Sequence, residues 1–85
     1  MNRRLLLQRL RQGAVRNVSF SDLVNLLKGF GFRELRIRGS HHVYSHPFVP
    51  RVVPLQPQHG QAKSYQIREI LRLIDRYNLR LEDES

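Results

Sequence analysis

The stretch FRELRIRGSHHVYSHP, residues 32–47, predicts a β-hairpin. Apolar and charged residues alternate in its first half, which places Leu35 and Ile37 on one side of a strand and the charged residues on the other. Gly39 and Ser40 then mark a tight turn, and HHVYSH follows as the second strand. We therefore expect the first strand to be half-buried, with a basic outer face.

A helix is predicted directly before the hairpin, in SFSDLVNLLKGFGF. Ser19 is suited to the N-cap, because Asp22 follows three residues later as in a capping box. Apolar residues then recur at helical spacing. Gly29 or Gly31 would end this helix, since glycine adopts the left-handed conformation that often closes a helix.

A third strand and a second helix are predicted after the hairpin. RVVPL, residues 51–55, reads as a short strand, and Pro54 restricts it to an edge because proline donates no backbone hydrogen bond. Residues 56–63 form a loop. From Ser64 as N-cap, isoleucines and leucines recur at helical spacing and predict an amphipathic helix.

The order of these elements predicts an α+β fold. A three-stranded antiparallel sheet must cover one apolar face, and two helices can do so while the other face stays open. Residues 3–12 add a short helix to a basic N-terminal extension. We expect three parts in the chain, namely the extension at 1–18, a main domain at 19–79 and an acidic tail at 80–85.

Positive charge dominates the chain, with 15 Lys and Arg against 7 Asp and Glu, a net charge of +8. Residues 1–18 hold five arginines and no acid, whereas the residues from 64 onward are near balance. Such an excess indicates a nucleic-acid surface, although a plain solvated basic surface is the alternative. The chain has no cysteine and no apolar run of membrane-spanning length. We therefore expect a cytoplasmic protein without disulfides or a membrane segment.

The four histidines do not have the spacing of a metal site. His41 and His42 are adjacent on a strand, so their side chains point to opposite faces. His42 and His46 share a face, but four residues of strand separate them by about 13 Å. We therefore expect no metal ion and no other cofactor.

A catalytic role needs fewer histidines than a metal site does. One imidazole can act as general base or acid at neutral pH, and Arg36 and Arg38 beside it can stabilise the charge that grows on a phosphate during cleavage. RNA supplies its own nucleophile, the 2′-hydroxyl, so a metal is not required. The alternative is that the histidine only contacts phosphate.

The run Gly39 to Pro47, GSHHVYSHP, together with the flanking helices DLVNLLKGFGF and IREILRLI, resembles the HicA (YcfA-like) family of toxin mRNA interferases. The resemblance covers residues 19–79. It implies a fold like that of double-stranded-RNA-binding domains, α-β-β-β-α, and a metal-independent endoribonuclease that uses a motif histidine. It also implies mRNA as substrate and a HicB-like antitoxin as partner. A non-catalytic RNA-binding protein of the same fold is the alternative function, and a protein-interaction module that pairs its sheet edge with a partner strand is a weaker one.

The motif leaves His41 and His42 open as the catalytic residue. If Tyr44 faces the core, His42 points inward with it and His41 faces the open sheet; if Val43 points inward instead, His42 is on the open face. We favour His41. The residues expected to contact RNA, in addition to the motif turn at Gly39, are Lys28, Arg33, Arg36, Arg38, Ser40 and Lys63.

Overall fold

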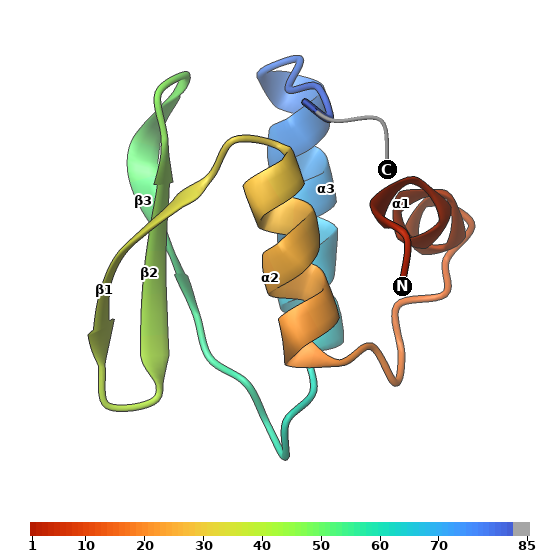
Figure 1. Cartoon of the computed structure of the whole chain (residues 1–85), viewed down its shortest axis with the longest axis horizontal. Coiled ribbons are helices and arrows are strands. Elements are labelled where there is room, and N and C mark those ends of the chain that lie inside the picture. Colours follow the sequence, from red (N-terminus) through yellow and green to blue (C-terminus); the bar gives the residue numbers. More distant parts are fainter. Residues whose placement is uncertain (83–85) are drawn as a thin grey trace.

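The computed structural model describes residues 1–82 and has three helices and one three-stranded sheet (Figure 1). The elements are α1 (Arg3–Arg11), α2 (Phe20–Gly29), β1 (Arg33–Arg38), β2 (His41–His46), β3 (Val49–Leu55) and α3 (Ser64–Arg76). This confirms the predicted α+β class and the predicted order of elements. None of the helices within residues 1–82 has the length and apolar character that crossing a membrane requires.

The sheet is antiparallel, with β2 between β1 and β3. A bulge at Leu35 interrupts the pairing of β1 with β2, so that Glu34 pairs with Tyr44 and Arg36 with Val43. An extra residue in one strand reverses its alternation. Glu34 therefore lies on the face that the helices cover, and the prediction that it shares the outer face with the arginines is wrong.

The helices form two further layers beside the sheet (Figure 1). α2 and α3 cover one face of the sheet, and α1 lies on their far side. The core between these layers is apolar and almost completely buried. Its main members are Leu6 and Leu10 of α1, Leu23, Leu26 and Leu27 of α2, Tyr44, Val53 and Leu55 of the sheet, and Ile67, Ile70 and Ile74 of α3.

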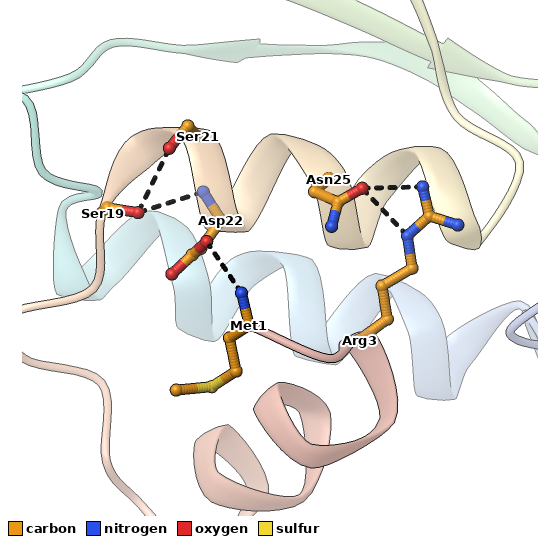
Figure 2. Close-up of polar contacts among 6 residues, drawn as sticks. All are labelled: Met1, Arg3, Ser19, Ser21, Asp22 and Asn25. Atoms are coloured by element: carbon orange, nitrogen blue, oxygen red, sulfur yellow. Dashed lines mark hydrogen bonds and ion pairs between the residues drawn. The ribbon is translucent and has the colours of Figure 1, made fainter. Parts of the chain in front are cut away.

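The ends of α2 follow the sequence closely. The hydroxyl of Ser19 accepts a hydrogen bond from the backbone N–H of Asp22 at 3.1 Å, which confirms the predicted N-cap (Figure 2). Gly31, two residues beyond the helix, has φ +94°, a value that glycine adopts at no steric cost. The chain can therefore turn at once into β1.

Polar contacts join α1 to α2 and α3. The guanidinium of Arg3 donates two hydrogen bonds to the side-chain oxygen of Asn25, at 3.1 and 2.7 Å (Figure 2). At the other end of α1, Arg11 forms an ion pair with Asp75 of α3 at 2.9 Å. The N-terminal helix is thus held at both ends, in addition to its buried leucines.

Two expectations about individual residues are wrong. Leu35 and Ile37 are 51% and 55% exposed, because the edge strand β1 extends beyond the cover of the helices and all six of its residues are exposed. Ser64 is the first residue of α3 rather than its N-cap, which is Lys63. The Ser64 hydroxyl instead donates to the carbonyl of Val15 at 2.9 Å. The expected acidic tail lies partly outside the described residues.

Candidate nucleic-acid interface and active site

The β1–β2 hairpin places His41 beside arginines on the face of the sheet that no helix covers. Arg38 is the strand partner of His41, and Arg36 and Arg33 follow along β1 on the same face. We call these four residues the basic sheet face. Its three arginines are exposed, and their side chains have no hydrogen-bonding or ionic partner within residues 1–82. The face can therefore attract a polyanion to the imidazole of His41.

His41 also borders a cavity of about 490 Å³ between β3 and α3. Tyr65, a residue that is 62% exposed, lines this cavity together with its neighbour Gln66. The side chain of Gln56, on the opposite wall, donates a hydrogen bond to the hydroxyl of Ser40 at 2.9 Å and so ties the hairpin turn to the cavity. An aromatic ring and amide groups beside an imidazole are suited to a nucleotide.

His42 points to the opposite side of the sheet. Its ring packs against Phe20 of α2, with ring centroids 4.9 Å apart, and its Nδ1 lies 3.5 Å from a carboxylate oxygen of Glu34. It lines a separate groove of about 370 Å³ that also includes Lys28. His41 and His42 thus point to opposite sides of the sheet, as the alternation of strand side chains predicts. Within residues 1–82, no group of three or more His, Cys, Asp or Glu side chains lies close enough together to hold a metal ion.

Tyr44 explains why His42 faces inward. Its side chain is 1% exposed and belongs to the core, and its hydroxyl donates to Glu34 at 3.2 Å. Burial, and then the hydrogen bond and negative charge of Glu34, raise the pKa of Tyr44 to about 12. Tyr44 therefore stays neutral at physiological pH and acts as a structural donor. The alternation of strand side chains then orients His42 toward the helices with Tyr44.

His46 is a structural residue at the end of β2. It is 8% exposed, and its Nε2 lies 2.8 Å from the carbonyl oxygen of Phe30. Its Nδ1 accepts a hydrogen bond from the backbone N–H of Phe48 at 3.1 Å. A neutral ring protonated on Nε2 satisfies both groups at once. The ring thus joins the β2–β3 turn to the end of α2.

The structure does not bring all the predicted RNA-binding residues together. Lys28 lies near Arg33, in a concavity at the start of β1. Lys63 lies at the start of α3, with Arg16 and Arg68 as neighbours in another concavity.

Two residues were missed by the sequence reasoning. Glu34 could not be identified as the partner of Tyr44 and His42, because the bulge is not visible in the alternation of the sequence. Tyr65 could have been noticed as an aromatic residue outside the apolar stripe of its helix.

One comparison with known proteins gives a result. A family model described as "HicA toxin of bacterial toxin-antitoxin" matches residues 20–75, more than half of the chain. The match includes the hairpin and the two helices that cover the sheet, and it begins after α1. Searches of curated proteins and of solved structures found no match.

Proposed function

Since the chain belongs to the HicA toxin family of bacterial toxin-antitoxin systems, we propose that it is an mRNA interferase whose His41 cleaves RNA without a metal ion. The observation that supports this most is the position of His41. It is an exposed imidazole that borders both the arginines of the open sheet face and a cavity of about 490 Å³.

In the proposed reaction, the imidazole of His41 accepts the proton of the RNA 2′-hydroxyl. The 2′-oxygen then forms a bond to the adjacent phosphorus, and the bond from phosphorus to the 5′-oxygen of the next nucleotide breaks. The leaving 5′-oxygen takes a proton from water, and the hydroxide so formed takes up the proton held by His41, which returns the imidazole to its neutral state. The products are a 2′,3′-cyclic phosphate and a 5′-hydroxyl, so water is not needed as a nucleophile.

The neighbouring side chains supply binding and charge. Arg38, and Arg36 two residues before it on the same face of β1, can hold the phosphate and stabilise the extra negative charge of the transition state. The exposed ring of Tyr65 can stack on a base. Contacts of these kinds recognise phosphates and base faces, so we expect weak sequence preference.

Membership in the family implies an antitoxin partner. We propose a HicB-like protein that covers the basic sheet face with an acidic surface and so excludes RNA. The substrate and this partner are both expected in the cytoplasm. The roles proposed for the sequence-predicted residues are catalysis for His41, structural support for His42, and RNA contact for the other residues.

The experiment is an incubation of the purified protein with RNA in excess EDTA. We expect RNA fragments to accumulate, and a DNA oligonucleotide of the same sequence to stay intact because it lacks the 2′-hydroxyl. If RNA is stable in EDTA but is cleaved after a divalent metal is added, the proposed chemistry is wrong.

One observation favours a second candidate function. The side chain of His41 makes no hydrogen bond within residues 1–82, so no group of the described chain orients its ring. A binding module with the same basic face would need no such orientation. It would bind RNA with strong salt dependence and yield no fragments.

A further inference from the structure

The ion pairs of the protein leave a second group of cations without acidic partners. On α3, Glu69 binds Arg51 and Arg72, and its pKa is lowered chiefly by the hydrogen bond from Arg72. Asp75 binds Arg11. Arg16, Lys63 and Arg68 make no ion pair or side-chain hydrogen bond within the described chain, and with His59 they surround an open concavity of about 570 Å³. We call these four residues the end cluster; no acidic residue lines its concavity.

The walls of this concavity are fixed by hydrogen bonds between segments far apart in the sequence. The N–H of Ala62 donates to the carbonyl of Val18 at 2.8 Å, and the N–H of Phe20 donates to Gly60 at 2.9 Å. The Ser64 hydroxyl bonds to Val15 from the start of α3. The backbone segments that carry these cations are therefore ordered before a ligand binds, which lowers the entropic cost of binding.

The end cluster is continuous with the proposed active site. Tyr65 lines both the concavity of the end cluster and the cavity next to His41. Gln56, which is bonded to the hairpin turn at Ser40, is only three residues from His59, a separation of at most about 11 Å. In Figure 1 the hairpin turn, the loop after β3 and the start of α3 all lie at the same end of the molecule.

Arg16 belongs to the N-terminal extension and lies before the segment that matches the family. It is held in place because Val15 and Val18 on either side of it are buried and their carbonyls are bonded to the residues after β3. The packing of α1 against α2 and α3 also fixes the start of the segment that joins α1 to α2, in which Arg16 lies. The extension therefore contributes a cation to the concavity.

We propose that the end cluster is a second phosphate-binding site, which holds the RNA backbone a few nucleotides away from the phosphate that is cleaved at His41. The inference rests on the proposed function for its choice of RNA as ligand. Tyr65 lies between the two sites, so the bound RNA passes its ring between the cleaved nucleotide and the part of the RNA held by the end cluster. Long RNAs gain affinity from the end cluster, whereas RNAs too short to reach it do not.

The test compares two double variants with the same change in charge. Arg16→Ala with Arg68→Ala removes two cations of the end cluster, and Arg76→Ala with Arg80→Ala removes two exposed cations at and beyond the last residue of α3. Binding of 2′-O-methyl RNA, which cannot be cleaved, is measured by fluorescence anisotropy over a range of salt concentrations. The probes are a trinucleotide and an oligonucleotide of about 12 nucleotides.

For the longer probe, the end-cluster variant should bind about tenfold more weakly than the wild type at about 0.15 M salt, and the slope of log K against log salt should be shallower by about 1.4. Its affinity for the trinucleotide should match that of the wild type, and the control variant should lose clearly less affinity. Equal losses in both variants, an equal loss for the trinucleotide, or an unchanged affinity of the end-cluster variant for the longer probe would overturn the proposal. Because these probes cannot be cleaved, a wild type without nuclease activity contradicts the proposed catalysis and leaves the binding comparison decisive for the end cluster.

Discussion

Replacement of His41 by alanine is expected to reduce the rate of RNA cleavage by about 10²–10⁴-fold, the usual contribution of a general acid or base. The side chain is exposed and makes no hydrogen bond within residues 1–82. The free energy of unfolding should therefore change by less than about 0.5 kcal/mol. Cleavage of a labelled RNA in EDTA and urea denaturation measure the two quantities on the same preparation.

His42→Ala is the matched control, because it removes the neighbouring imidazole. This variant loses the contact with Phe20 and the interaction with Glu34, so it should be less stable by about 1 kcal/mol. At temperatures below its unfolding transition, this variant should still cleave RNA at a rate close to that of the wild type. An active His41→Ala protein with an inactive, folded His42→Ala protein would contradict the assignment of His41 while leaving an RNase function in place.

His46→Ala should have the largest effect on stability among the histidine variants, a loss of about 2–4 kcal/mol in the free energy of unfolding. The substitution opens a cavity beside the rings of Phe32 and Phe48, whose centroids lie 5.0 and 5.5 Å from that of His46. It also removes the hydrogen-bond partner of the Phe30 carbonyl. Urea denaturation at neutral pH measures the loss.

Two further variants separate the causes of this effect. His46→Gln can keep a donor near the Phe30 carbonyl and should recover part of the lost stability. His41→Ala removes the same atoms from an exposed position and should change stability little. If His46→Ala were as stable as His41→Ala, the structural role assigned to the buried ring would be wrong.

Local sequence signals predicted the elements of the fold well. Ser19, with Asp22 three residues later, correctly marks the start of α2, and the spacing of Ile67, Ile70 and Ile74 correctly predicts the apolar face of α3. These signals are reliable because capping and helical periodicity depend on residues within one or two turns. The alternation of β2 was equally informative, since a buried Tyr44 implies the opposed directions of His41 and His42.

Features that depend on distant parts of the chain were not predictable in this way. The bulge at Leu35 changes the face on which Glu34 lies, and alternation alone assumes that no bulge occurs. The exposure of Ile37 depends on how far the helices reach across the sheet. Similarly, charge alone predicts that Lys63 lies with the sheet arginines, whereas in the fold it lines the same concavity as Arg16.

The chemical ends of the RNA fragments test the central claim most directly. Attack by the 2′-hydroxyl, with His41 as base and without a metal ion, leaves a 2′,3′-cyclic phosphate on the upstream fragment and a 5′-hydroxyl on the downstream one. Mass spectrometry of the products formed in EDTA distinguishes these ends from all others. We predict the cyclic phosphate with the 5′-hydroxyl; fragments that carry a 3′-hydroxyl and a 5′-phosphate would contradict the proposed reaction.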